Sequence, residues 1–371
     1  MAAVPASLQR VLLALLSVLS MATGVLVSYK AIFEPPKPDF ERIDAMSLAQ
    51  SRTALGLPSE GRLLPIDAPW AVQAEKFFFV LVNIFAELCK TRTGRGGFLA
   101  ILSMSMPVML FVCVQAIKPE THKLQRGLIV TGIFLLGQLI CMGAALPLLL
   151  VPLFALVRGM HLHKVYPERA FGVYGPRVVK MIQRTLLVPS VFMVLVPTTH
   201  WSWLMLNVAF QLFPLIFLSL SAYVAFVGPQ TSITTSKVSV LYEDNAVFTM
   251  VAHWWSLYLL YPVLRAYVSG DRVVLTDSER LIVWDLLGMF LTVIYLIGID
   301  IIADLNLKDE SGVRALHSAS FSKWLGAIVR SLFMSLIFGP GTMMDIYLAA
   351  REDAVTPTHS ASTTTKKNKI Q

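Results

Sequence analysis

The strongest constraint on the fold of this chain is the run Leu281–Ala303, which is apolar apart from two aspartates. It reads LIVWDLLGMFLTVIYLIGIDIIA, with Asp285 near its start, Asp300 near its end and Asp304 directly after it. About 20 apolar residues suffice to cross the hydrocarbon layer as a helix, so this run predicts a transmembrane helix. A charge at mid-membrane costs at least about 2.5–3.5 kcal/mol, so each acid there needs a functional or structural reason.

The acids of this run are suited to carrying a proton. Desolvation favours the neutral form of a carboxyl group, so an aspartate in an apolar pocket can stay protonated at neutral pH. Asp300 and Asp304 are four residues apart and share a helix face. Asp285 lies ~22 Å from Asp300 along the axis. We expect Asp300, the deepest acid, and then Asp285 to donate a proton to a lipophilic substrate; the alternative is that Asp285 and Asp304 are interfacial residues solvated by lipid headgroups.

The composition predicts a multi-pass membrane protein. Of 371 residues, 56% are hydrophobic and 15% charged, against about 45–50% and about 25% in soluble domains. The formal net charge of +8 is spread over loops and tail, which is typical of topology signals and argues against nucleic-acid binding. The three cysteines form no disulfide or metal-binding pattern, and we expect no metal and no cofactor.

The apolar segments predict an all-α fold, a polytopic transmembrane helical bundle of about eight spans within a range of seven to nine. Two candidates are short for a span, and the fourth is long enough to be tilted or broken at Pro147 and Pro152. The candidate spans are Val11–Tyr29, Phe77–Leu88, Phe98–Ile117, Leu128–Val157, Leu186–Thr198, Trp203–Val227, Ala246–Val268, Leu281–Ala303 and Trp324–Ala349.

The predicted organisation has four parts. Residues 1–30 form an N-terminal membrane anchor, with a cleaved signal peptide as the alternative. Residues 31–76 form a polar loop, either lumenal or a partly ordered lid. Residues 77–350 form the multi-span bundle expected to carry catalysis, and residues 351–371 form a disordered polar tail.

Loop charges and the tail bear on topology and location. The segments Lys90–Arg95 and Arg158–Arg184 are rich in Lys and Arg, and both are expected to be cytosolic. The final residues Lys-Asn-Lys-Ile-Gln match the K-x-K-x-x pattern of dilysine retrieval signals, which predicts a cytosolic tail and the endoplasmic reticulum. Eight spans would bring the tail and the Arg158–Arg184 loop to the same side.

Two further acids are candidates for the site. Glu87 follows Asn83 by four residues on one helix face, although a helix-end Glu beside Lys90 is also typical of a solvated pair. Asp345 lies beyond Gly339-Pro340-Gly341, a break that would end or kink the last helix and leave backbone groups facing a cavity. Arg330 is an intramembrane cation whose acidic partner is expected on another helix.

Aromatic residues lie beside the acids along the chain. His253, Trp254 and Trp255 are consecutive, and Tyr295 lies on the acid-bearing helix. They form either an interfacial belt or a substrate-binding wall whose ring faces stabilise a carbocation by cation–π attraction. His253 is either a proton carrier or a structural hydrogen-bond donor. We expect at least two of the four acids to converge within ~10 Å on one apolar pocket lined by Trp or Tyr.

Other enzyme classes lack their motifs in this sequence. No phosphate-binding glycine loop, G-x-S-x-G, H-E-x-x-H or C-x-x-C-H occurs. Asp300-Ile-Ile-Ala-Asp304 has the D-x-x-x-D spacing of intramembrane prenyltransferases, but the second acidic motif of those enzymes is absent. A prenyltransferase, a transporter and a non-enzymatic scaffold remain alternatives, and the sequence does not indicate the oligomeric state.

The order and character of several segments resemble the fungal membrane-bound terpene cyclases of the ascofuranone and ascochlorin type. The resemblance implies cyclisation of a farnesyl chain carried on an aromatic or polyketide head group, started by protonation of a terminal epoxide or alkene without a metal. The ligand would thus be a lipophilic prenylated small molecule taken from the bilayer. The segments are FAELCKTRTGRGG, YPERAFGVYGPRVVKM, DNAVFTMVAHWW, LIVWDLLGMFLTVIYLIGIDIIADL and FGPGTMMD.

Overall fold

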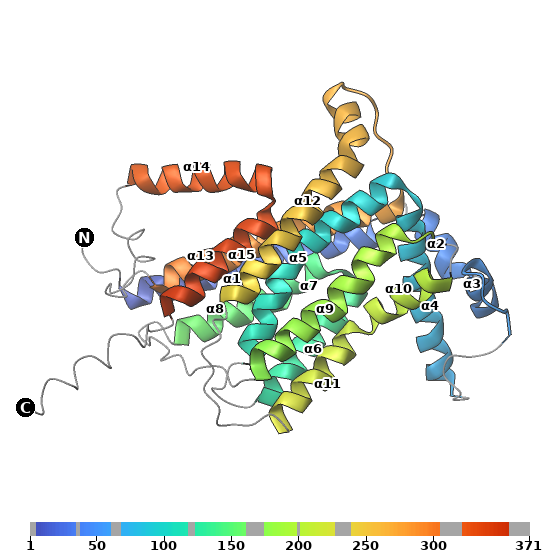
Figure 1. Ribbon diagram of the computed structural model, residues 1–371, viewed down its shortest axis with the longest axis horizontal. Helices are drawn as coiled ribbons and strands as arrows, with labels where there is room; N and C mark the ends of the chain where they lie inside the picture. The colour runs from blue at the N-terminus through green and yellow to red at the C-terminus, as the bar shows by residue number, and fades with distance from the viewer. Residues whose placement is uncertain are drawn as a thin grey trace, which may run out of the picture.

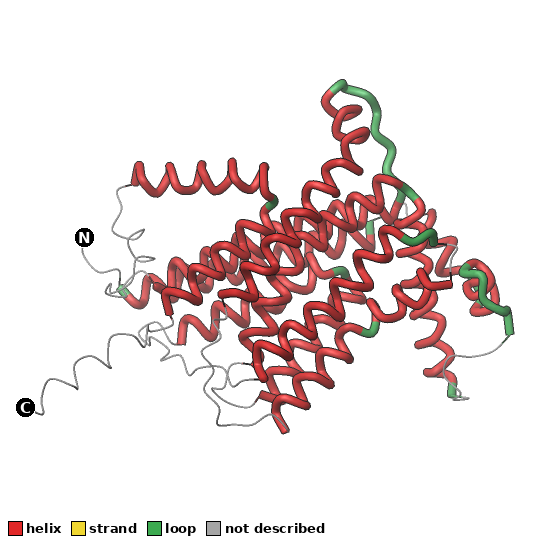
Figure 2. Tube along the Cα trace, in the orientation of Figure 1, coloured by secondary structure: helices red, strands yellow, loops and turns green. Residues whose placement is uncertain are grey.

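All regular secondary structure in the described part of the chain is helical. The computed structural model describes residues 5–34, 38–60, 68–117, 123–160, 174–198, 201–226, 239–304 and 321–355. Every regular element in these ranges is a helix (Figure 2), which confirms the all-α prediction. Much of the loop segment YPERAFGVYGPRVVKM and the last residues of the predicted tail lie outside these ranges.

Several helices are long and apolar enough to cross a membrane. Among the described residues five qualify by length and composition, and two sharply bent helix pairs raise the number to seven. The chain is therefore a multi-pass membrane protein, with an approximate span count that meets the predicted range at its lower end. The five are the helices that contain Ala6–Phe33, Arg92–Val114, Met142–Met160, Ser239–Val268 and Asp277–Ala303.

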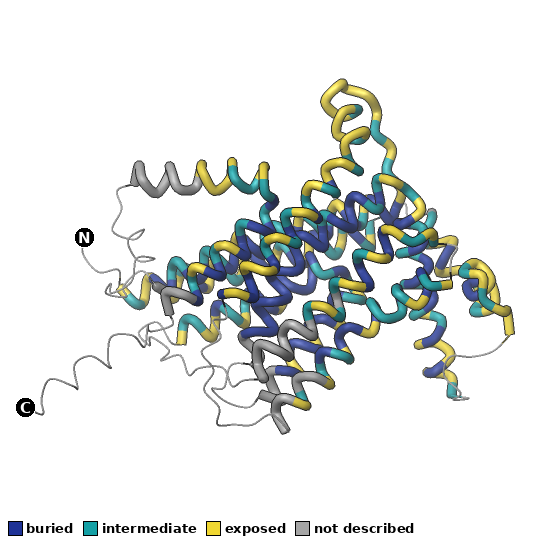
Figure 3. Tube along the Cα trace, in the orientation of Figure 1, coloured by how far each residue is buried: buried dark blue, intermediate teal, exposed yellow. Residues whose placement is uncertain are grey.

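Helix α5 (Arg92–Ile117) forms the centre of the bundle. In its apolar window 94% of the residues are buried, and it packs against α12 (Ser239–Val268) and α13 (Asp277–Asp304) (Figures 1 and 3). On the other side it contacts α6 (Lys123–Ile140) and α9 (Tyr174–Leu195). Helices α10 (Trp201–Gln211) and α11 (Phe213–Phe226) complete that side as a pair bent by 52°. A helix that is apolar all round belongs at such a centre.

The long fourth segment is not broken where we expected. The chain folds back at Cys141, which has φ 67°, so that α6 and the helix after it pack against each other. The second helix comprises α7 (Met142–Ala145), a π-helical turn at Leu146–Leu150 and α8 (Val151–Met160). Pro147 lies inside the π-helical turn, whose widened backbone accommodates the missing N–H without a break. The prediction of a break at Pro147 and Pro152 was wrong.

The predicted break at Gly339 is confirmed. Helix α14 (Phe321–Phe338) and helix α15 (Pro340–Val355) are bent by 120° at this residue, which has φ 96°. Both helices run from the bend toward the same end of the bundle (Figure 1). We call this pair the α14–α15 hairpin. Its tip touches the middle of α12, where a Cβ on Gly339 would lie 2.8 Å from the Cβ of His253.

The ends of the predicted organisation are more structured than expected. Helix α1 (Ala6–Ser28) packs along α13 and α8. Within the predicted polar loop, α2 (Pro38–Ala45) and α3 (Leu48–Ala54) pack on α4 (Pro69–Lys90). Helix α15 continues to Val355, so the first residues of the predicted tail are helical. Two of these residues, Arg351 and Glu352, make ion pairs that hold this end of the helix.

The two basic segments lie at opposite ends of α13. Thr91, in the first segment, donates to Glu279 at the start of α13, whereas Arg158 pairs with Asp300 near its end. The 21 residues between these positions span ~31 Å of helix, which is about the thickness of the hydrocarbon layer. With α13 spanning the layer, these two contacts face opposite sides, which disagrees with the prediction that both segments are cytosolic. The Arg158 end also holds the end of α15.

Candidate functional site

A buried polar network surrounds Asp345 where α15 crosses α12. Asp345 is completely buried, and both of its carboxylate oxygens accept from the Asn245 amide, each at 2.9 Å. The Thr249 hydroxyl donates to Oδ2 at 3.1 Å. Asn245 and Thr249 are four residues apart on α12, so they present adjacent groups to the same carboxylate. All described hydrogen-bond donors to Asp345 are uncharged.

The network continues into neighbouring helices. The Gln183 side-chain amide on α9 donates to Oδ1, the side-chain oxygen of Asn245, at 2.6 Å. This bond directs the side-chain NH₂ group of Asn245 toward Asp345. On the other side, the hydroxyls of Thr249 and Thr342 lie 3.1 Å apart. The network thus holds Asp345 in place with side chains from three helices. The hydroxyl groups of Thr249 and Thr342 extend the network toward the protein surface.

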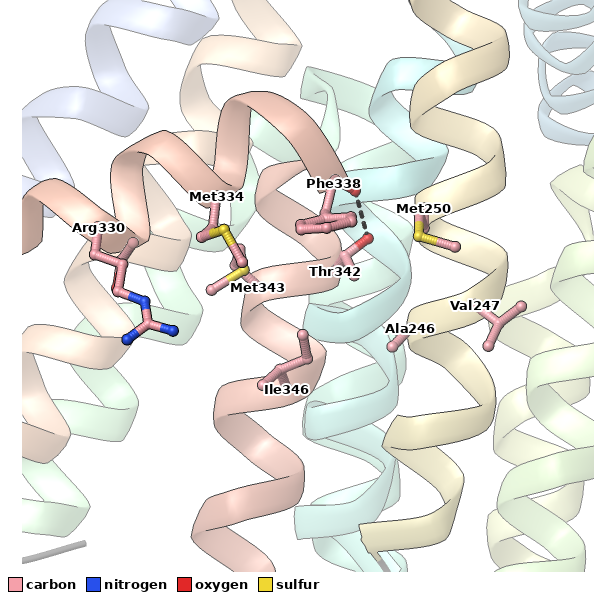
Figure 4. Close-up of a pocket in the computed structure, with 10 residues that line it drawn as sticks. Ala246, Val247, Met250, Arg330, Met334, Phe338, Thr342, Met343 and Ile346 are labelled. Atoms are coloured by element: carbon pink, nitrogen blue, oxygen red, sulfur yellow. Dashed lines mark hydrogen bonds between the residues drawn. The ribbon is translucent and has the colours of Figure 1, made fainter. Parts of the chain in front are cut away.

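A groove of about 440 Å³ lies between α12, α14 and α15 (Figure 4). Thr342 belongs to its wall, so the groove reaches the polar network through one side chain. Apart from Arg330 and Ser331 the other lining residues are apolar, and they include three methionines and Phe338. Methionine side chains adapt to irregular apolar ligands. The lining residues are Ala246, Val247, Met250, Arg330, Ser331, Met334, Phe338, Thr342, Met343 and Ile346.

Arg330 lies at one side of this groove (Figure 4). It is nine residues before Gly339, or ~13 Å along α14 from the hairpin tip. The predicted acidic partner on another helix is not found among the described residues, where Arg330 makes no ion pair.

Asp300 lies in a different setting, a buried ion cluster that joins α8, α13 and α15. Its carboxylate is 2.8 Å from Nε of Arg351 and 3.3 Å from Nε of Arg158. The Tyr347 hydroxyl donates to it at 3.4 Å, and Arg351 also pairs with Glu352 at 3.1 Å. Both guanidinium groups already engage this carboxylate. This setting suits a structural brace better than a neutral proton donor.

Asp285 stabilises the turn at Cys141. Its carboxylate accepts from the backbone N–H of Gly143, at the start of α7. The first N–H groups of a helix lack partners within the helix, and a carboxylate satisfies them well. Here the backbones of α7 and α13 touch, since a Cβ on Gly288 would lie 2.0 Å from the Gly143 carbonyl oxygen. Asp285 therefore lies where the backbones of α7 and α13 pack directly against each other.

Glu87 lies on the surface at the end of α4. Its carboxylate is 2.9 Å from Lys90 and 3.6 Å from Arg42, and its side chain is 35% exposed. This is the solvated pair that the sequence left open as the alternative.

The predicted aromatic wall has mainly structural contacts. The Trp254 ring N–H donates to the backbone carbonyl oxygen of Ile337 at 2.6 Å. His253 Nε2 lies 3.3 Å from the backbone carbonyl oxygen of Leu336. They satisfy carbonyl groups that α14 leaves free where it ends. Trp255 packs on an apolar cluster around α4 and α5. The hydroxyl of Tyr295 bonds to that of Thr23 on α1 at 2.8 Å.

The four predicted acids therefore occupy four separate settings, and the described contacts do not bring two of them into one pocket. Only Asp345 of the four lies beside the groove, and its partners Asn245 and Thr249, with Gln183 bonded to Asn245, were missed. A sequence signal for them exists on α12. Its buried stripe repeats polar residues at helical spacing within an apolar segment, namely Ser239, Tyr242, Asn245, Thr249 and Ser256.

Comparison of the chain with protein-family models, curated proteins and solved structures finds no match. The geometry around Asp345 is therefore what bears on function.

Proposed function

We propose that this protein is a membrane-embedded terpene cyclase of the endoplasmic reticulum, and that Asp345 supplies the proton that starts the reaction. The observation that carries the proposal is a buried carboxyl group with only uncharged partners beside an apolar groove. General acid catalysis needs a donor near the reacting atom, and a dry site protects the cation from water. The resemblance of the sequence to fungal membrane-bound cyclases agrees with this reading.

The groove would hold the prenyl chain of the substrate. Its methionines and Phe338 offer an apolar surface, and the ring face of Phe338 would stabilise positive charge in the folded chain. The Thr342 hydroxyl, bonded to Thr249 next to Asp345, stands between the acid and the groove. A proton would pass from Asp345 through these hydroxyls, or directly after a small movement of α15, to the epoxide or alkene.

Membranes containing the protein test the proposal directly. Incubation with a labelled farnesylated aromatic epoxide should give a cyclised product of equal mass, which chromatography and mass spectrometry distinguish from the substrate. Met334→Trp should block the groove and abolish the product. Leu332→Trp on the exposed side of the same helix is the matched control and should retain activity. Equal product from membranes without the protein would refute the proposal.

A transporter is the second candidate, and the α14–α15 hairpin favours it. Transporters place binding sites near the membrane centre at interrupted helices, and the hairpin tip is such an interruption. Reconstituted vesicles separate the two functions. A transporter would move the labelled compound across the bilayer unchanged, whereas a cyclase would convert it without requiring two compartments. The ion cluster around Asp300 gives less support to a prenyltransferase, because its carboxylate is already held by two arginines.

A further inference from the structure

Tyr242 is a buried hydroxyl group that the proposed reaction leaves unexplained. It lies on α12 with its side chain fully buried, and its hydroxyl has no hydrogen-bond partner in the described part of the chain. Buried polar groups are nearly always hydrogen-bonded, so an exception calls for a functional explanation. Burying such a group without a partner is unfavourable. A phenylalanine here would avoid that cost.

The position of Tyr242 relates it to two acids on α15. Tyr242 lies three residues before Asn245 on the same buried stripe of α12. Helix α15 runs antiparallel to α12, because Asn245 meets Asp345 while His253 meets the hairpin tip. Glu352, two turns beyond Asp345 and ~10 Å from it along the axis, is therefore on the Tyr242 side.

The electrostatic surroundings agree with this arrangement. The titratable groups whose charges act on the Tyr242 hydroxyl are Glu352, Arg351 and Asp345 on α15 and Cys113 on α5. Glu352 is buried near the end of α15 and is paired with Arg351. Tyr242 thus has one carboxyl group toward the membrane interior and one toward the end of the bundle.

We propose that Tyr242 relays protons between Glu352 and Asp345. The inference rests on the proposed role of Asp345, which loses its proton to the substrate in each turnover. The Tyr242 O–H then transfers its proton to the Asp345 carboxylate and takes one from the Glu352 carboxyl group, which water at that end of the bundle reprotonates. The cation loses a proton as the product forms, so the cycle consumes none.

Hydrogen–deuterium exchange of the Asp345 carboxyl group tests the relay without any substrate. The infrared C=O band of the protonated acid, assigned by its absence in Asp345→Asn, shifts when the group exchanges in D₂O. Tyr242→Phe keeps the ring and removes the relay, so exchange should slow by about tenfold or more. Tyr261→Phe, an exposed position on the same helix, is the matched control and should exchange at the wild-type rate.

A fluorotyrosine at position 242 provides a second variant with nearly native packing. Its more acidic hydroxyl should change the exchange rate while the fold is kept, which distinguishes a relay from a packing role. Unchanged exchange in both Tyr242 variants would overturn the relay. Slowed exchange in a protein that forms no cyclised product would support the relay and refute the cyclase, so the two proposals fail separately.

Discussion

Asp300 and Asp345 are both buried aspartates in apolar helices, yet their surroundings differ in kind. Asp300 is held by the guanidinium groups of Arg158 and Arg351, whereas Asp345 is held by an amide and a hydroxyl. The first site balances charge with charge. The second offers only dipoles, which can accommodate either protonation state.

Asp300 and Asp345 are the same residue type, and their different positions along the bundle give them different roles. The Asp300 cluster joins three helices at the end where α8 and α15 terminate, so it resembles a brace between them. The Asp345 network lies next to a groove open to the lipid side. A buried ion pair is costly to break, while Asp345 has no charged partner among the described residues.

The largest expected effect is on chemistry at Asp345. Asp345→Asn keeps the shape of the side chain but removes the transferable proton, so cyclisation should fall by about 10²–10⁴-fold, the usual contribution of a general acid. Product formation per amount of purified protein measures this. Asp271→Asn, on an exposed loop, should be unaffected. Full activity in Asp345→Asn would show that Asp345 is not the proton donor, and the proposed difference in role between Asp345 and Asp300 would be lost.

The next largest effect is on stability at Asp300. Asp300→Asn removes the buried carboxylate that Arg158 and Arg351 share and leaves only Arg351 with a second acid, Glu352, which should destabilise the protein by about 3–5 kcal/mol. Thermal unfolding in detergent should show the loss. Adding Arg158→Met should recover part of it, because the double variant carries less uncompensated charge. A stable single variant with no cyclase activity would instead return Asp300 to the role of proton donor that the sequence suggested.

A smaller effect is expected at the hydroxyl beside Asp345. Thr249→Val removes a hydrogen bond to the carboxylate and the link to Thr342 at nearly constant volume. We expect a loss of about 0.5–1.5 kcal/mol in stability together with a reduced rate of product formation. Thr292→Val on α13, whose hydroxyl bonds only within its own helix, is the matched control. It should lose similar stability but keep its rate, and equal rates in both variants would contradict a role for Thr249.

The smallest effect is expected at the hairpin tip. Trp254→Phe removes the hydrogen bond to the Ile337 carbonyl oxygen, with a cost of about 0.5–1.5 kcal/mol. The change should raise amide exchange at the tip, which positions Asp345, and leave the end of α13 around Asp300 unchanged. Mass-spectrometric hydrogen exchange resolves the two regions. Uniform exchange changes in both would mean that they are not independent.

Part of the site was predictable because it depends on local sequence. The break at Gly339-Pro340-Gly341 follows from a missing N–H and a permissive glycine, and it was found where expected. The turn at Cys141 was missed, since it depends on Asp285 and Gly288 of another helix rather than on the prolines nearby. Asp345 was one of four candidates, and nothing in its own segment indicated that Asn245 would be its partner.

The sequence by itself determined that the chain is a helical membrane bundle, because long apolar runs can satisfy their backbone groups in lipid only as helices. It also determined that acids would lie inside that bundle. The tertiary structure decided which acid has a charged partner and which does not. That choice depends on residues more than 40 positions apart, such as Asp300 with Arg351 and Asn245 with Asp345, which only the packing of helices brings together.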